Sequence, residues 1–204
     1  MKSEVVKNKA DLGVVFDGDG DRVCFFDDLG RPLDSYEIFN YIKGYFDSPY
    51  VVDVRALSKF TMPDETVIET KVGRYFVVQA MKKNNAGLGV EYSGHFYFKN
   101  FFYTDSGILA SIHMLNYLSK IKSEGKMLSD IKGNSHYVRL PEVDFTVDSP
   151  QKIIAKMQEY FNGEEGVRLE TVDGLTAYAK DFAFNIRGSV TEPVVRFTLV
   201  AENS

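Results

Sequence analysis

The chain has 204 residues, and its 24 lysine and arginine residues against 29 aspartate and glutamate residues give a formal charge of −5 at pH 7. Hydrophobic residues make up 44% of the sequence, and 16 Phe and 12 Tyr supply so much surface to bury that disorder is excluded as the main state. The mild acidity and the lack of a basic stripe argue against nucleic acid as a partner. No apolar run approaches the roughly 20 residues of a membrane span, and the start lacks the apolar core of a signal peptide, so we expect a cytoplasmic protein.

The first two thirds of the chain alternate between predicted strands and predicted helices. The strands, which are rich in β-branched and aromatic residues, are Leu12–Phe16, Arg22–Phe26, Tyr50–Val54, Glu65–Lys71, Leu88–Tyr92 and Phe96–Phe101. The helices, which repeat apolar residues at helical spacing, are Tyr36–Phe46, Tyr75–Asn84 and Ile108–Ile121. This alternation predicts a mainly α/β layer.

Three single features of this region carry structural expectations. Asp105 is predicted to be the N-cap of the helix Ile108–Ile121. That helix has one apolar stripe, formed by Ile108, Ile112, Leu115 and Leu118. The single cysteine, Cys24, excludes an internal disulfide framework and is expected in the packed core rather than as a nucleophile.

After Gly125 the pattern changes to short strands around one helix, Pro150–Phe161. The predicted strands are His136–Leu140, Asp144–Val147, Val167–Val172, Thr176–Lys180, Phe182–Arg187 and Val194–Val200. Runs of strands with a single helix predict a smaller α+β domain with an antiparallel sheet. We place the boundary between the two regions near Lys132–Ser135.

The strongest chemical signal is a loop in which Asp17, Asp19 and Asp21 alternate with two glycines and are followed by Arg22. Three carboxylates so close together repel one another unless a cation lies between them, and oxygen ligands of this kind suit Mg²⁺. An EF-hand does not fit, because its sixth position would be Arg22 instead of glycine and its twelfth Asp28 instead of glutamate. A solvated acidic turn between hairpin strands is the alternative, in which Arg22 neutralises aspartates instead of pairing a phosphate.

A second polar cluster, Glu91–His95, joins two predicted strands. Glu91 and Ser93 stand at i and i+2, which places both side chains on one face, where they could hold neighbouring sugar hydroxyls. His95 could contact a phosphate or move a proton. The alternative interpretation is a polar β-turn with an exposed histidine.

A third cluster lies between the last two predicted strands. Arg187, Ser189 and Thr191 offer one guanidinium and two hydroxyls around a glycine, which could together cradle a phosphate. An ordinary hairpin loop is the alternative.

These three loops, in this order, resemble those of the α-D-phosphohexomutase superfamily, the phosphoglucomutase and phosphomannomutase enzymes, over essentially the whole chain. In that family Asp-Gly-Asp-Gly-Asp-Arg is the Mg²⁺ loop, a Gly-Glu-Met-Ser-Gly-His type of loop recognises sugar hydroxyls, and Arg-x-Ser-Asn-Thr-Glu-Pro binds the substrate phosphate. The last two correspond here to Val90–His95 and Arg187–Pro193. The resemblance implies Mg²⁺ as the cofactor and a hexose phosphate as the substrate.

The resemblance also implies roles that the residues alone do not suggest. Lys71–Arg74 looks like the family's Lys-x-Gly-His stretch, which implies substrate contacts for Gly73 and Arg74, and Arg55 stands where the family often has a basic residue. Arg22 and His95 become catalytic candidates in a phosphoryl transfer that passes through a bisphosphorylated sugar. The sequence departs from the family pattern at Val90, Arg74 and Val190, which replace glycine, histidine and asparagine.

The fold that the resemblance implies is α/β, with a mixed-sheet α/β/α domain, the last strands of a preceding similar domain, and a smaller α+β domain with an antiparallel sheet. Residues 1–30 would be the tail of the family's second domain with the Mg²⁺ loop, 31–134 the sugar-recognition domain and 135–204 the phosphate-binding domain. The family's phosphoserine domain has no counterpart before Asp17. We therefore expect this chain to bind Mg²⁺ and a hexose phosphate but not to turn over alone.

Three explanations of the missing phosphoserine domain stay open. A separate chain could carry the phosphoserine domain, or the sequence could be an expression fragment. The chain could also be a non-catalytic protein that binds sugar phosphates or a partner. The sequence does not decide among these, and it does not choose the hexose.

Overall fold

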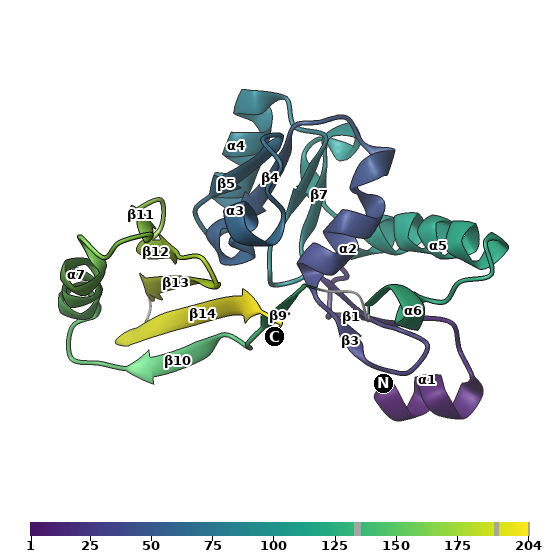
Figure 1. The fold of residues 1–204 in the computed structure, drawn as a ribbon. Coiled ribbons are helices and arrows are strands. Elements are labelled where there is room, and N and C mark those ends of the chain that lie inside the picture. The colour runs from purple at the N-terminus through teal and green to yellow at the C-terminus, as the bar shows by residue number, and fades with distance from the viewer. Residues whose placement is uncertain (133–135, 190–191, 204) are drawn as a thin grey trace.

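The computed structural model describes residues 1–132, 136–189 and 192–203, and Figure 1 shows these residues as three β-sheets with helices packed against them. The helices of the described residues are α1 (Lys2–Asn8), α2 (Ser35–Ile42), α3 (Ser58–Thr61), α4 (Arg74–Asn84), α5 (Gly107–Ser123), α6 (Leu128–Lys132) and α7 (Pro150–Phe161), with 3₁₀ turns η1 (Lys43–Tyr45), η2 (Val54–Ala56) and η3 (Lys99–Phe101). None of these helices is long and apolar enough to cross a lipid bilayer.

The first sheet is a small antiparallel one, in the order β1-β2-β3. Its strands are β1 (Gly13–Phe16), β2 (Val23–Phe26) and β3 (Pro32–Leu33). A tight turn links β2 to β3, in which the Gly30 N–H donates to the Asp27 carbonyl at 2.8 Å. Among the strands described, β2 is the one partner of β1, so the other edge of β1 is left without a β-sheet neighbour.

The central sheet is mixed, with the order β5-β4-β6-β7-β8. The strands are β4 (Tyr50–Asp53), β5 (Val67–Thr70), β6 (Leu88–Val90), β7 (Phe96–Phe98) and β8 (Thr104–Asp105). β4 is parallel to β5 and β6, whereas β7 and β8 are added antiparallel. Alternate residues of β4 face opposite layers: Val52 packs with α2 and α5, and Val51 packs against Val77 and Met81 of α4. Helices therefore cover both faces of this sheet, as predicted.

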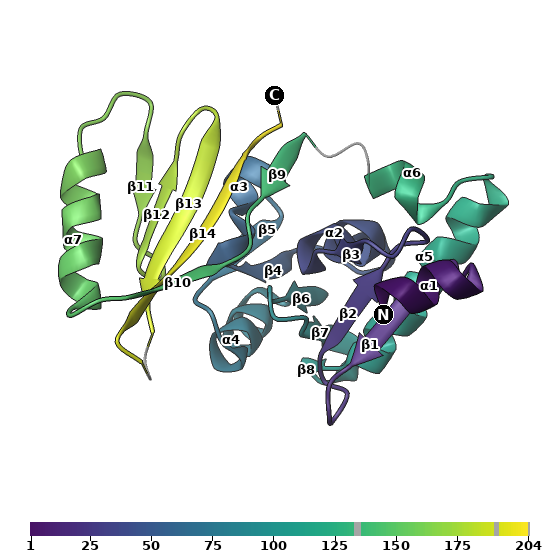
Figure 2. The ribbon, with the colours of Figure 1, turned by 90° about the horizontal axis from the view of Figure 1, so that it is seen from below.

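The third sheet is wholly antiparallel, in the order β10-β14-β13-β12-β11, with β9 also paired to β14. Its strands are β9 (Tyr137–Arg139), β10 (Val143–Thr146), β11 (Arg168–Glu170), β12 (Leu175–Tyr178), β13 (Phe182–Gly188) and β14 (Val194–Glu202). α7 covers one face, and on another side Leu57 from the central unit packs with Tyr178 and Val200. Figure 2 shows this sheet at one end of the molecule and β1 with α1 and α5 at the other.

The predicted fold class, a mixed-sheet α/β unit followed by a smaller antiparallel α+β unit, is thus confirmed. The domain limits 1–30, 31–134 and 135–204 stay a prediction, and residues 133–135 of the expected boundary lie outside the described residues. The structure adds α1, α3, α6, β3 and β8, which the sequence patterns did not predict.

Three local expectations are wrong. Ser106, not Asp105, caps α5, because the Ser106 hydroxyl accepts the Leu109 N–H. The apolar stripe faces outward: Ile108, Ile112 and Leu115 are 59%, 48% and 49% exposed, and among its members only Leu118 is buried. Cys24 is exposed, since alternation along β2 buries its neighbours Val23 and Phe25 instead.

Candidate active site

The acidic loop between β1 and β2 is organised around Asp17. Its Oδ1 accepts the N–H groups of Gly20 and Arg22, each at 3.2 Å, and its Oδ2 lies 2.5 Å from Arg22 Nε. One carboxylate oxygen each from Asp17, Asp19 and Asp21 lies within 4.8 Å of the others. The loop thus gathers three oxygen donors of the kind that a hard divalent cation prefers.

The pKa values of Asp17 and Asp21 are shifted in opposite directions. Loss of water alone would raise the pKa of Asp17, but its hydrogen bonds to Arg22 and the charge of Arg22 outweigh that effect and hold this pKa below its usual value. Desolvation raises the pKa of Asp21 despite the opposing charge of His95, and the carboxylates of Asp19 and Asp17 raise it further. Mutual repulsion at Asp21 is what a bound cation would relieve.

The acidic loop is docked on the loop between β6 and β7 and on the start of α5. The Val23 N–H donates to the Gly94 carbonyl at 3.1 Å, and the Gly107 N–H donates to the Gly20 carbonyl at 3.1 Å. Both glycines are needed for this approach. A Cβ on Gly94, whose φ is +93°, would lie 2.7 Å from the Val23 carbonyl oxygen, and one on Gly107 would lie 2.9 Å from the Gly20 oxygen.

His95 lies at the meeting point of these loops. Its Nε2 is 3.6 Å from Asp21 Oδ2 and 3.9 Å from Asp105 Oδ2, and its Nδ1 is 2.8 Å from Ser93 Oγ and 3.7 Å from Glu91 Oε2. The structure therefore brings together Glu91, Ser93 and His95. It also adds Asp105, for which the sequence predicted only a role in helix capping.

Glu91 is buried, and both of its oxygens accept hydrogen bonds. Oε1 accepts the Gly73 N–H at 2.8 Å, which brings the start of α4 to the site, and Oε2 accepts the Tyr97 hydroxyl at 2.5 Å. Burial, with the Glu91 charge adding to it, raises the pKa of Tyr97 well above its ordinary value. Ser93, in contrast, is exposed. Glu91 and Ser93 were predicted to present their side chains on one face, and in the structure both side chains contact His95.

Arg74 and Asp105 form an ion pair at the rim of this cluster. Arg74 Nη2 is 2.8 Å from Asp105 Oδ1, and the arginine side chain is exposed whereas the aspartate is buried. The pair links α4 to β8, so Arg74 reaches the surroundings of His95 through Asp105.

Arg55 lies buried beneath the site and is held by Asp53. The Asp53 carboxylate accepts hydrogen bonds from Arg55 Nε at 2.9 Å and from Arg55 Nη2 at 2.8 Å. It also accepts hydrogen bonds from the Tyr36 hydroxyl and the Tyr92 N–H. Burial would raise the pKa of Asp53, but the Arg55 charge and hydrogen bonds hold it below its usual value. Arg55 Nη2 is also 4.0 Å from Glu91 Oε1.

Glu142, between β9 and β10, connects this region to the antiparallel sheet. Its Oε1 lies 3.9 Å from Arg55 Nη1, and its Oε2 lies 3.3 Å from Arg187 Nη2. Sequence reasoning missed Glu142 because a lone glutamate in a loop carries no local signal. The Ser189 N–H donates to the Val194 carbonyl at 2.9 Å, whereas the predicted phosphate contact Thr191 lies outside the described residues.

A continuous series of contacts therefore joins many of the predicted site residues that the structure describes. It runs from the acidic loop through His95 and Glu91 to Arg55, and from there through Glu142 to Arg187. These residues are far apart in the sequence and come from loops, a turn and a strand that adjoin all three sheets.

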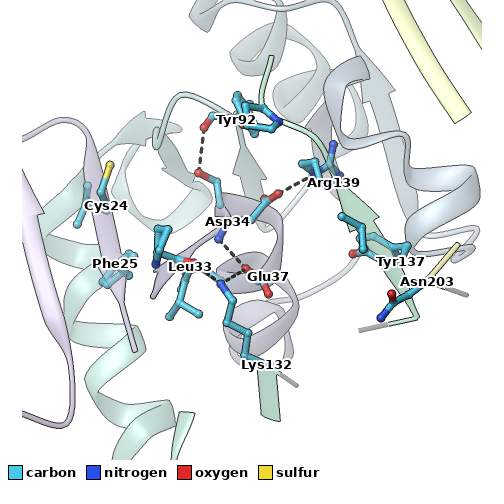
Figure 3. A pocket seen from close by; sticks show the side chains of 16 residues that line it. Cys24, Phe25, Leu33, Asp34, Glu37, Tyr92, Lys132, Tyr137, Arg139 and Asn203 are labelled. Atoms are coloured by element: carbon cyan, nitrogen blue, oxygen red, sulfur yellow. Dashed lines mark hydrogen bonds and ion pairs between the residues drawn. The ribbon is translucent and has the colours of Figure 1, made fainter. Parts of the chain in front are cut away.

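A separate pocket of about 570 Å³ lies between the first sheet, α2 and β9 (Figure 3). Its charged side chains pair with one another: Asp34 Oδ2 is 2.7 Å from Arg139 Nε, and Lys132 Nζ is 3.4 Å from Glu37 Oε2. None of the predicted site residues that the structure describes lines it, so we place the candidate site at the loops instead.

The fold resembles that of solved proteins of the phosphoglucomutase/phosphomannomutase family, as comparison with known structures shows. Residues 56–136 match the family described as phosphoglucomutase/phosphomannomutase, alpha/beta/alpha domain III. The chain as a whole corresponds to the C-terminal half of such proteins, and the resemblance predicted from the motifs is confirmed.

Individual relatives agree with this assignment. The chain is 36% identical to a phosphomannomutase of Methanocaldococcus jannaschii over 98% of its own length and 29% identical to a phosphomannomutase of Escherichia coli over 97%. A crystal structure of a phosphoglucomutase/phosphomannomutase family protein from Burkholderia thailandensis covers the whole chain with a TM-score of 0.80 at 23% identity. The chain spans 45% of the length of each of these three proteins.

Proposed function

We propose that this chain is the part of a phosphohexomutase that binds Mg²⁺ and a hexose phosphate. Phosphoryl transfer between two positions of the sugar would then need a second part that carries a phosphoserine. The observation that supports the proposal best is the series of contacts that joins the acidic loop to Arg187 through His95, Glu91 and Arg55. It puts three clustered carboxylates and a buried guanidinium at the two ends of one polar region.

The donor set of the acidic loop fits Mg²⁺. Asp17, Asp19 and Asp21 present clustered carboxylate oxygens, the donors that a hard divalent cation prefers. When bound, the metal would stabilise negative charge on the phosphoryl group that is transferred.

The neighbouring residues would handle the phosphoryl group and protons. Asp17 holds Arg22 Nε, and the rest of this half-exposed guanidinium is available to steady a phosphoserine. His95 would hold or move a proton at a sugar hydroxyl, with Asp21 and Asp105 at its Nε2 to stabilise the charged imidazole.

The remaining predicted residues would bind the substrate. Arg187, Ser189 and Thr191 are assigned to the phosphate that does not react. Contacts with the sugar and its hydroxyls are assigned to Arg55, Gly73, Arg74, Glu91 and Ser93. Because both relatives described above are phosphomannomutases, mannose 1-phosphate is the first substrate to test.

Calorimetric titration with Mg²⁺ and then with mannose 1-phosphate tests this proposal. We expect Asp19→Asn to abolish Mg²⁺ binding and Arg187→Gln to abolish sugar-phosphate binding. Asp11→Asn is the matched control, because Asp11 pairs with Lys122 and lies outside the acidic loop. A folded wild-type chain that binds neither ligand would refute the proposal. Mutase turnover by the pure chain would refute the need for a phosphoserine part.

A further inference from the structure

Glu142 lies between two buried arginines, Arg55 of the turn η2 that follows β4 and Arg187 of β13. The side chains of Arg55 and Arg187 are only 6% and 9% exposed, and the Glu142 side chain is 18% exposed. Oε1 faces Arg55, and Oε2 faces Arg187 and also accepts the Thr198 hydroxyl at 3.4 Å. A carboxylate in this position neutralises charge that the protein interior would otherwise carry uncompensated.

The two arginines are not equally satisfied. Asp53 binds Arg55 through two short hydrogen bonds, so Glu142 is a secondary partner for it. The contact from Arg187 to Glu142 is 3.3 Å, longer than the roughly 2.8 Å of a strong charge-assisted bond, and Arg187 Nε is buried with no hydrogen-bond partner among the residues that the structure describes. Arg187 therefore has unused capacity for a better anion.

We infer that Glu142 is a built-in competitor for the phosphate that Arg187 binds. The inference rests on the proposed function, in which Arg187 is a phosphate ligand. A phosphate can offer two oxygens to one guanidinium and carries up to two charges, so it satisfies Arg187 Nε as well as Nη2 and displaces the carboxylate.

Displacement of Glu142 makes binding selective. A neutral sugar cannot compete with a carboxylate for a guanidinium, so only a phosphorylated ligand reaches Arg187. Glu142 acts through Arg187 and is thus a specificity residue that need not touch the sugar. Its other contacts, to Arg55 and Thr198, keep the carboxylate paired while it is displaced.

The test is the affinity for mannose 1-phosphate, measured by calorimetry at constant ionic strength, in the wild type and in Glu142→Gln. The amide keeps the shape and a hydrogen-bond acceptor but removes the competing charge. We expect affinity to rise about tenfold, since a like charge beside a bound anion opposes binding strongly. A purely structural role for Glu142 predicts equal or weaker binding.

Asp144→Asn is the matched control. Asp144 is two residues further along the chain and lies 3.5 Å from Arg196 Nε, so the variant removes the same charge nearby without touching Arg187. We expect its affinity to stay within about twofold of the wild type. An equal gain in Asp144→Asn would overturn the inference, because the effect would then come from net charge alone.

Thr198→Val provides a second route if Glu142→Gln does not fold. It removes the hydroxyl that holds Glu142 Oε2 and preserves the side-chain shape, so it should raise affinity about threefold by weakening the competitor. Wild-type binding with no gain in either folded variant would overturn the inference and leave the proposed function standing. Absence of wild-type binding would instead refute the proposed function itself, and the inference with it.

Discussion

Replacing Gly94 by alanine should separate the acidic loop from the loop that carries His95. Gly94 has a φ of +93°, a conformation that costs an L-residue about 1–2 kcal/mol. The new Cβ would lie 2.7 Å from the Val23 carbonyl oxygen, which forces the two loops apart and weakens the 3.1 Å bond from the Val23 N–H. That bond contributes about 1 kcal/mol, so we expect a total loss of about 2–3 kcal/mol in the free energy of unfolding.

Urea denaturation followed by far-UV circular dichroism measures this loss. Gly44→Ala is the matched control, because Gly44 has no positive φ and nothing lies within 4 Å of the place that a Cβ would occupy on it. The control should change the free energy of unfolding by less than about 0.5 kcal/mol. If Gly94→Ala were as stable as Gly44→Ala, the argument that this glycine permits the docking of the two loops would be wrong.

Three further predictions concern stability. Asp53→Asn should cost about 3–5 kcal/mol in urea denaturation, because Arg55 would stay buried without its carboxylate. Leu57→Ala should cost about 2–5 kcal/mol in the same assay, since Leu57 is fully buried against the antiparallel sheet. Desolvation lowers the pKa of His113, so the unfolded chain takes up its proton first and stability falls as the pH drops below about 6.5. His113→Phe should therefore lose less stability than the wild type between about pH 7.5 and pH 5.5, and an equal loss would contradict this assignment.

Local patterns sufficed for the strands around the acidic loop and for α7. The sequence there combines β-forming residues with a charged turn, or a Ser-Pro start with helical periodicity, and both signals act over a few residues. The clustering of Asp17, Asp19 and Asp21 was also predictable, since it needs only neighbouring positions in one loop.

Features that depend on distant residues could not be predicted in this way. Asp105 and Ser106 are equally good capping residues by type, but Ser106 caps α5 while the Asp105 carboxylate pairs with Arg74, which is far away in the sequence. Periodicity found an apolar stripe on α5, but the sheets that this helix meets decide that Ala110 and Met114 face inward instead. Glu142 becomes significant only when two arginines that are far apart in the sequence converge on it.

The free edge of β1 has a practical consequence for work with this chain. Among the described strands, β1 has a neighbour on one side only, so the backbone N–H and C=O groups of its other edge have no strand partner. Unpaired backbone groups along a strand edge form a template on which another strand can assemble. Concentrated solutions of the isolated chain are therefore expected to self-associate through β1.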